Sequence, residues 1–388
     1  MKVAILANRA ASYVRPMAEG LKRMLSRVDV EATIFYEGLD ELSGLPEEFD
    51  VYVRRNGNDP RRVARRAAKY FLIEAPRVRR FVRALRRFDV IVVVNTIPNA
   101  FLSSFFNDRT LRRLLPHIPI VLYDVFYLPT RGPWSRWLLE GNAERGVQPD
   151  HHWGLDRYDW YLCASVVSET PLPAGPNPCS LIGLDLDDGT LYPEEKGEFT
   201  VLLDFECTEY MAERAIQIQA CEESGTKYVV LHGRYPIHQI RAIYRKASVL
   251  LLAMRESFGL PICELQACGS YIFTPYADWC PSHSLKSDLS RPGLGDLSPN
   301  FIVYGNDKNR LIDELRRIKA AYEPGAVVAN FRKYHPQLFW GDEVALADFV
   351  AKVRAGQVTS QSHRHYPSLH EIADTASRAR AGCSSSAA

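Results

Sequence analysis

The residues of this sequence with the greatest capacity for chemistry lie in one short stretch, residues 255–269, which reads RESFGLPICELQACG. The residue types predict a strand exit, a glycine-containing turn and a short helix with proline at its first position. Backbone amides at a helix start have no intrahelical partner, and they form a binding site for a phosphate or another anion. Glu256 precedes the turn, and Glu264 lies in the first helical turn, where its Cα–Cβ bond leans toward the helix start.

Two carboxylates beside an anion site would repel the anion unless a hydroxylated group lies between them. A nucleotide sugar supplies such groups, because Glu264 can accept hydrogen bonds from both ribose hydroxyls and Glu256 from hydroxyls of the transferred sugar. The structural alternative is an acidic helix cap in which Glu256 pairs with Arg255. That alternative explains Glu256 but not the whole stretch.

The stretch resembles the Glu-x7-Glu signature of retaining GT-B glycosyltransferases, the family-4-like glycosyl transferases of group 1. The matching residues are Glu256, Phe258, Gly259, Leu260, Pro261, Glu264, Ala267, Cys268 and Gly269. Upstream, residues 243–249 are similar to the helix-to-strand run of that family, and residues 181–193 to its linker segment. The resemblance covers residues 160–275, and in the N-terminal half it extends only to the order of the elements.

This resemblance implies transfer of a sugar from a nucleotide-diphosphate sugar to a glycan or lipid-linked acceptor, with retention of anomeric configuration. No metal and no cofactor are expected, because the helix start and nearby cations stabilise the departing diphosphate. Glu256 is the catalytic candidate of the C-terminal half. The expected donor-binding residues are Glu264, Ser257, Phe258, Gly259, Leu260, Arg234 and Arg255.

One departure from the family pattern concerns the donor's phosphates. Where the family carries Gly-Arg and then a lysine, residues 204–210 read DFECTEY, which is acidic. Negative charge at that place would weaken diphosphate binding unless a nearby arginine compensates. The candidates are Arg214, Arg255 and Arg234, of which Arg234 is preferred because it follows a glycine at a predicted strand end.

A second departure lies in the first domain, where Asp124 stands at the place of a histidine that the family often has. Open α/β sheets keep functional groups at the carboxyl ends of their strands, so Asp124 is expected either to bind a sugar hydroxyl or act as a general base, or simply to cap the strand. Asn95 and Asn99, after the preceding strand, are candidates for contact with the acceptor. The Asp-x-Asp at residues 185–187 is expected to be a solvated turn.

Strand-length apolar runs and helical patterns alternate twice along the chain. Strands are expected at residues 3–7, 89–94, 118–123 and 160–165, and again at 199–203, 228–232, 248–254, 271–274 and 300–304. Helices are expected at residues 60–88, with a break near Pro76, and at 212–223, 237–246, 261–268 and 307–321. The order predicts an α/β protein of the GT-B type, with two Rossmann-like doubly wound domains facing a cleft. The expected domains are an acceptor domain at 1–190 and a donor domain at 195–340, followed by a helix at 341–355 that packs back on the first domain and a tail at 356–388.

Composition sets further bounds. The chain has 388 residues, 46% of them hydrophobic, which excludes intrinsic disorder for its bulk. No apolar run reaches the roughly 20 residues that a membrane span needs. Eight cysteines show no metal-ligand spacing, which favours a reduced, cytoplasmic compartment.

The formal net charge of +2 hides a basic block between Arg54 and Arg87, where thirteen basic residues stand against two acidic ones. Anionic lipid attracts such a block by about 1 kcal/mol per basic residue near the surface, so we hypothesise a peripheral position on the inner membrane face. A solvated helix face is the structural alternative. Nucleic acid is not expected as a partner, because the block carries no known nucleic-acid-binding motif.

Two other functions stay open. One is a catalytically silent GT-B module that binds a sugar nucleotide or a glycan, a possibility that the acidic segment Asp204–Glu209 keeps open. The other is a nucleotide-sugar epimerase, although such enzymes normally lack the paired glutamates. The donor's base and sugar, the acceptor and the oligomeric state cannot be read from the sequence.

Overall fold

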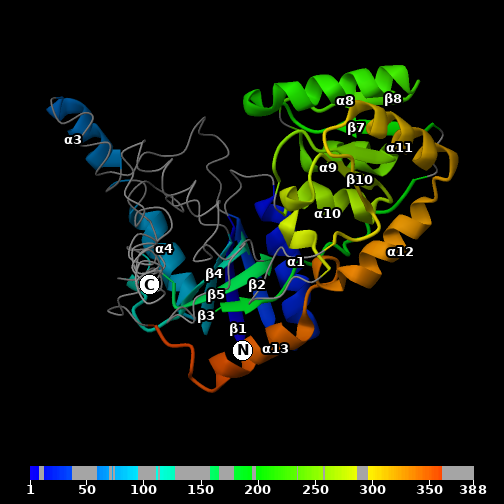
Figure 1. Cartoon of the computed structure of the whole chain (residues 1–388). Coiled ribbons are helices and arrows are strands. Elements are labelled where there is room, and N and C mark those ends of the chain that lie inside the picture. Colours follow the sequence, from blue (N-terminus) through cyan, green and yellow to red (C-terminus); the bar gives the residue numbers. More distant parts are fainter. Residues whose placement is uncertain are drawn as a thin grey trace, which may run out of the picture. The chain divides into compact units, whose positions relative to one another are not determined.

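The computed structural model describes residues 1–7, 13–36, 59–69, 72, 75–94, 111, 114–126, 158–165, 179–194, 198–233, 235–256, 258–285 and 296–360. The chain divides into two compact units (Figure 1). Unit 1 comprises Met1–Ala164, Pro173–Ile182 and Glu343–Ala388, and unit 2 comprises Ser165–Leu172 and Gly183–Asp342.

Unit 1 is built on a sheet with the strand order β2-β1-β3-β4-β5-β6. The strands are β1 (Lys2–Ala7), β2 (Glu31–Tyr36), β3 (Val90–Val94), β4 (Ile120–Phe126), β5 (Trp160–Ser165) and β6 (Cys179–Leu181). The helices are α1 (Val14–Arg27), α3 (Pro60–Lys69), α4 (Ala75–Leu85) and α13 (Glu343–Arg354). β1 pairs in parallel with β2 and β3, β3 with β4, and β5 with β6. The β-branched run of β3 is almost wholly buried, as expected for a parallel strand that is covered on both faces.

Within the described residues of the basic block lie the helices α3 and α4, and the predicted break near Pro76 coincides with the start of α4. Proline fits the first turn of a helix because no amide hydrogen is needed there. On α4, Phe81, Val82 and Leu85 are buried, whereas a set that we call the exposed arginines of α4 faces solvent. This set is Arg79, Arg80 and Arg83. No helix in the described ranges is both long enough and apolar enough to cross a membrane.

Unit 2 has a five-stranded sheet with the order β11-β10-β9-β7-β8. Its strands are β7 (Thr200–Leu203), β8 (Lys227–Val230), β9 (Val249–Leu251), β10 (Tyr271–Thr274) and β11 (Phe301–Val303), all paired in parallel. Its helices are α8 (Met211–Glu223), α9 (Ile237–Lys246), α10 (Leu260–Ala267), α11 (Lys308–Ala320) and α12 (Pro324–Tyr334). Short 3-10 helices are η3 (Thr208–Tyr210), η4 (Ala277–Trp279), η5 (Pro281–His283) and η6 (Pro336–Leu338).

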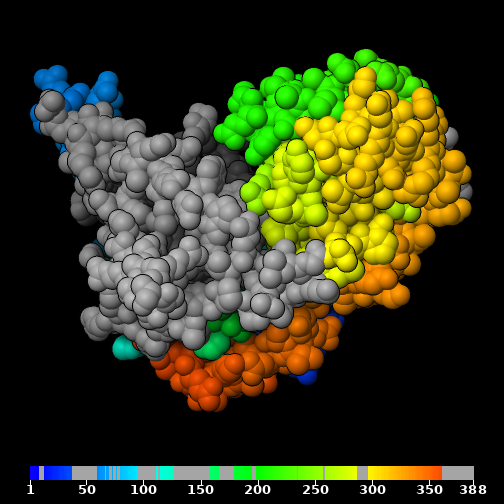
Figure 2. Space-filling view, viewed as in Figure 1, coloured from blue at the N-terminus to red at the C-terminus, as the bar shows by residue number. Residues whose placement is uncertain are grey.

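Helices cover both faces of the unit 2 sheet. The surfaces of α8 and α11 adjoin in Figure 2, and the Lys308 ammonium donates to Glu223 across them at 2.6 Å. Figure 1 shows α10 on the other side of the strands from α8. Crossovers between parallel strands are right-handed as a rule. The chain moves from β7 toward one end of the sheet, to β8, and from β9 toward the other end, to β10, so the connecting helices α8 and α10 lie on opposite faces. The predicted class, two doubly wound α/β domains with parallel sheets, is therefore confirmed.

The chain passes from unit 1 to unit 2 at residues 182 and 183. The amide of Ile182 donates to the Cys163 carbonyl in unit 1 at 2.9 Å, whereas the amide of Leu184 donates to the Gln337 carbonyl in unit 2 at 2.8 Å. This junction lies earlier than the predicted boundary at residues 190–195. The helix α13 returns to unit 1, where the Phe349 ring lies 6.0 Å from that of Trp160.

Candidate functional site

The strand order of unit 2 reverses between β7 and β9, which are neighbours in the sheet. After β7 the chain turns toward β8 on one side, and after β9 it turns toward β10 on the other. In open α/β sheets, ligands bind in the crevice that such a switch point leaves beyond the carboxyl ends of the strands. Asp204 follows β7 directly, and Glu256 lies in the connection from β9 to α10. The topology thus brings the acidic segment and the predicted signature to the same edge.

Gly259 is the residue before α10 and has a φ of +56°, a conformation that favours glycine. A Cβ built at this position would lie 2.7 Å from Cγ of Glu256, so only glycine leaves room for that side chain. The backbone amide of Gly259 in turn hydrogen-bonds the Glu256 carboxylate. Turn and glutamate therefore hold each other in place.

Glu256 is a half-buried carboxyl group whose pKa is raised to about 7. Burial is the main cause, the negative charge of Asp204 adds to it, and the Gly259 amide opposes it. A group with this pKa exists in both protonation states near neutral pH, so it can donate or accept a hydrogen bond at this edge of the sheet.

Glu264 lies in α10 with 4% of its surface exposed, and its Oε1 accepts hydrogen bonds from Nε and Nη2 of Arg241 at 3.0 and 2.7 Å. Burial raises the pKa of Glu264, and the Arg241 charge opposes that change. Nη1 of Arg241 also bonds the Asp188 carboxylate and the Thr190 hydroxyl. The sequence showed no sign of this network, which joins α9, α10 and the start of unit 2.

The expectation of a solvated turn at residues 185–187 is wrong for Asp185, which is 1% exposed. Its Oδ1 accepts a hydrogen bond from the Asp187 amide at 2.9 Å. The segment lies against the chain end of unit 2, because the Leu186 amide donates to the Phe339 carbonyl at 2.8 Å. Asp187 itself is exposed, as predicted.

Phe258 is buried, and its ring stacks on the His283 ring with the centroids 5.9 Å apart. Nε2 of His283 lies 2.6 Å from the Phe258 carbonyl, so this nitrogen carries the proton and donates it. Burial lowers the pKa of His283 to about 3, and the neighbouring His335 contributes. The neutral imidazole thus supports the turn that holds Glu256, a role that the sequence did not reveal.

The other predicted site residues of unit 2 are placed as follows. Leu260 begins α10, and Nη2 of Arg255 lies 3.5 Å from Oδ2 of Asp278. The residues Ser257 and Arg234 lie outside the described part of the chain, as do Asn95 and Asn99 of unit 1. The structure therefore brings Glu256, Gly259 and Leu260 together at one turn.

Asp124 belongs to unit 1 and lies within β4, two residues before its end. It is 7% exposed, and its Oδ1 accepts a hydrogen bond from the Val125 amide at 2.6 Å. Its negative charge contributes to the raised pKa of Cys163 on β5, after burial and the Cys179 thiol. Within unit 1, Asp124 thus lies near the carboxyl edge of the sheet, where it was expected.

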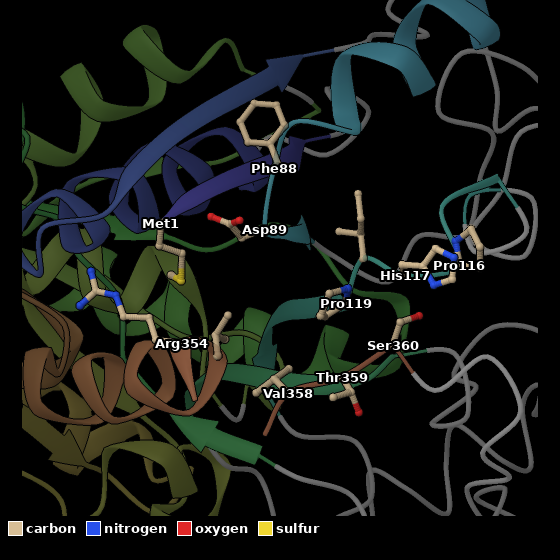
Figure 3. Close-up of a pocket in the computed structure, with 12 residues that line it drawn as sticks. Met1, Phe88, Asp89, Pro116, His117, Pro119, Arg354, Val358, Thr359 and Ser360 are labelled. Atoms are coloured by element: carbon tan, nitrogen blue, oxygen red, sulfur yellow. The ribbon is translucent and has the colours of Figure 1, made fainter. Parts of the chain in front are cut away.

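At the opposite, amino edge of the same sheet, unit 1 contains a cavity of about 670 Å³. Figure 3 shows Met1, Asp89 and Pro119, from the starts of β1, β3 and β4, and Arg354 from the end of α13 around it. None of the predicted site residues lines this cavity. Among the residues with described positions, no group of three or more His, Cys, Asp or Glu side chains could hold a metal ion.

No family model matches the chain, and no curated protein matches it. Among solved structures it is similar to HepE from Anabaena in complex with UDP-glucose (11% identity, TM-score 0.46, 92% of this chain and 100% of that chain covered). It is also similar to the UDP-GlcNAc 2-epimerase from Neisseria meningitidis bound to UDP-GlcNAc (7%, 0.43, 92% and 100%). A third similar structure is the spinosyn rhamnosyltransferase SpnG (11%, 0.40, 90% and 100%). At such scores the likeness assigns neither activity nor substrate to the chain.

Proposed function

We propose that the chain is a GT-B glycosyltransferase that takes a nucleotide-diphosphate sugar at the carboxyl edge of the unit 2 sheet. The observation that carries this proposal is the turn before α10, where Gly259 packs on Glu256 and the helix start lies beside a switch point. Pro261 has no amide hydrogen, and the amides of Gly259 and Ile262 already donate to Glu256 and to the Gly259 carbonyl. The Leu260 amide, at the start of α10, is therefore the one proposed to bind a phosphate. Glu256 hydrogen-bonds hydroxyls of the sugar.

Glu264 is the proposed partner of the ribose hydroxyls. Its ion pair with Arg241 locks the carboxylate in one orientation, because Oε1 is engaged by two guanidinium nitrogens. A carboxylate that is preorganised in this way loses little freedom when the ribose binds. Arg234 and Arg255 are the proposed cations for the diphosphate.

The proposed reaction keeps the anomeric configuration and needs no metal. The acceptor oxygen attacks the anomeric carbon on the face that the donor phosphate leaves, and the carbon–oxygen bond to the phosphate breaks with its electrons on the phosphate oxygen. The acceptor's proton passes to that oxygen. The helix start stabilises the charge that develops there.

Unit 1 is the proposed acceptor domain. Asp124 would bind a hydroxyl of the acceptor or the sugar, and Asn95 and Asn99 would contact the acceptor, which is a glycan or a lipid-linked glycan. The exposed arginines of α4 would hold this unit on an anionic membrane surface on the cytoplasmic side.

The test begins with thermal shifts against UDP-, TDP-, GDP- and ADP-sugars, because a ligand that binds only the folded state raises the melting temperature. Hydrolysis of the best donor without acceptor is then compared in the wild type, Glu256→Gln and Glu209→Gln. We expect turnover to be lost in E256Q and kept in E209Q, since Glu209 is exposed. Wild-type protein that binds no donor would refute the proposal.

A second function, a silent module that binds a sugar nucleotide, is favoured by one observation. Asp204 and Glu256 place two carboxyl groups at the edge of the sheet where the phosphates are proposed to bind. Nη2 of Arg214 already donates to backbone carbonyls of the acidic segment. Binding without hydrolysis by the wild type would support this second function. For an active enzyme, the anomer released first, followed by NMR, reports whether configuration is retained.

A further inference from the structure

Asp204 and Glu256 lie at the ends of adjacent strands and interact through their charges. Asp204 follows β7, and its amide donates to the carbonyl of Leu251, the last residue of β9, at 3.2 Å. The negative charge of Asp204 is one cause of the raised pKa of Glu256. Both groups therefore border the proposed phosphate site.

The Asp204 side chain is buried, with 6% of the residue exposed, and its Oδ1 accepts a hydrogen bond from the Phe205 amide at 2.7 Å. Burial raises the pKa of Asp204 to about 6, although the Phe205 amide and the charge of Arg214 oppose the change. Asp204 thus gains its charge in the range in which cells operate, unlike an exposed aspartate.

Titratable groups approach Asp204 from each neighbouring element. They are Arg214 from α8, Tyr244 from α9 and Glu256 from the connection between β9 and α10. The Tyr244 hydroxyl is buried and its pKa is raised well above the usual value by burial, Glu264 and Asp204, so it stays neutral. The change of the charge around Asp204 with pH therefore comes from Asp204 and Glu256 themselves.

Arg214 is the second observation that points to a ligand. It is 3% exposed, and its Nη2 donates to the carbonyls of Asp204 and Phe205. Its Nε and Nη1 are buried without a hydrogen-bond partner in the described part of the chain. Buried guanidinium donors are normally satisfied, so an anionic oxygen from a ligand at the end of β7 would complete the hydrogen bonds of Arg214.

We propose that Asp204 is a specificity-determining residue of the donor site: as a neutral acid it admits the donor's diphosphate to the end of β7, and as a carboxylate it excludes it. The inference rests on the proposed function. A diphosphate diester keeps its negative charge across the whole neutral range, so only the protein's own groups can relieve the repulsion. Binding of the donor is then linked to uptake of a proton.

The experiment measures the dissociation constant of UDP-glucose and TDP-glucose by calorimetry from pH 5.5 to 8.5, with the full chain. The variants are Asp204→Asn, which keeps an oxygen for the Phe205 amide, and Glu206→Gln, which removes an exposed carboxylate two residues away. Circular dichroism at each pH checks that each variant is folded. From the proton on Asp204 alone we expect the wild-type dissociation constant to rise about tenfold per pH unit above pH 7, and loss of the Glu256 proton adds to this rise.

We expect D204N to bind at pH 8.5 at least tenfold more tightly than the wild type and to keep only the weaker pH dependence that Glu256 contributes, whereas E206Q keeps the wild-type profile. If the wild type binds with a constant independent of pH, or if D204N keeps the wild-type profile, this inference is overturned and the proposed function stands. If a folded wild type and D204N bind neither sugar nucleotide, nor any other of the panel, at every pH, the proposed function falls and the inference with it.

Discussion

Replacing Gly259 by alanine tests whether the turn before α10 holds Glu256 as the structure indicates. The substitution acts in two ways. A non-glycine residue at a φ of +56° loses about 1–2 kcal/mol, the usual penalty for the left-handed region. The new methyl group also lies 2.7 Å from Cγ of Glu256, and relieving such overpacking costs about 1–3 kcal/mol more.

Gly225→Ala is the matched control. Gly225 follows α8 with a φ of +63°, and a Cβ there would meet nothing within 4 Å. This variant suffers the backbone strain alone, about 1–2 kcal/mol. The difference between the two variants therefore measures the crowding of the new methyl group against Glu256 and against the Ile262 side chain, 3.0 Å away, which we expect to be worth about 1–3 kcal/mol.

Thermal unfolding followed by circular dichroism measures both variants, and 1 kcal/mol corresponds to about 2–4 °C in a domain of this size. Because the methyl group must push the Glu256 side chain away, we also expect G259A to lose the thermal shift produced by a nucleotide sugar, whereas G225A keeps it. Equal melting temperatures for the two variants, with donor binding intact in G259A, would refute the packing of Glu256 beneath this glycine.

Three further predictions concern charge. Arg241→Met leaves the buried Glu264 carboxylate unpaired, so we expect the free energy of unfolding, measured in urea, to fall by about 3–5 kcal/mol. The double variant that adds Glu264→Gln should recover part of this loss. An unchanged free energy of unfolding would mean that the pair is not formed. Burial lowers the pKa of His283 to about 3 and of His335 to about 4. Between pH 6.5 and pH 4 the unfolded chain therefore takes up protons that the folded chain does not bind, so we expect the free energy of unfolding to fall as the pH drops through this window. His283→Phe should weaken this pH dependence of the free energy of unfolding. Changing the exposed arginines of α4 to glutamine is expected to weaken sedimentation with anionic vesicles at low salt by about 1 kcal/mol per arginine removed, while neutral vesicles bind neither form. A wild type that shows no preference for anionic vesicles would leave the basic block a solvated helix face.

The amino-acid sequence by itself determined the alternation of strands and helices and the position of the key turn. The predicted helix at residues 261–268 corresponds to α10 at Leu260–Ala267, because glycine, leucine and proline in this order define a helix start through local backbone constraints. Runs of β-branched residues located β3 for the same reason. The helix α12 was not predicted, although Pro324 and the buried residues Val327, Val328 and Phe331 carry a helical pattern.

Only the tertiary structure decided which charges meet. Arg241 reaches Glu264 and Asp188 because α9 and α10 lie side by side over the sheet and the start of unit 2 returns to them, and no local pattern encodes that proximity. Asp204 approaches Glu256 because β7 and β9 are neighbours although β8 lies between them in the chain. Local conformation depends on residues a few positions apart, whereas burial and charge pairing depend on the order of strands in the sheet. The chemistry at the carboxyl edge of the unit 2 sheet is therefore set only in the folded chain.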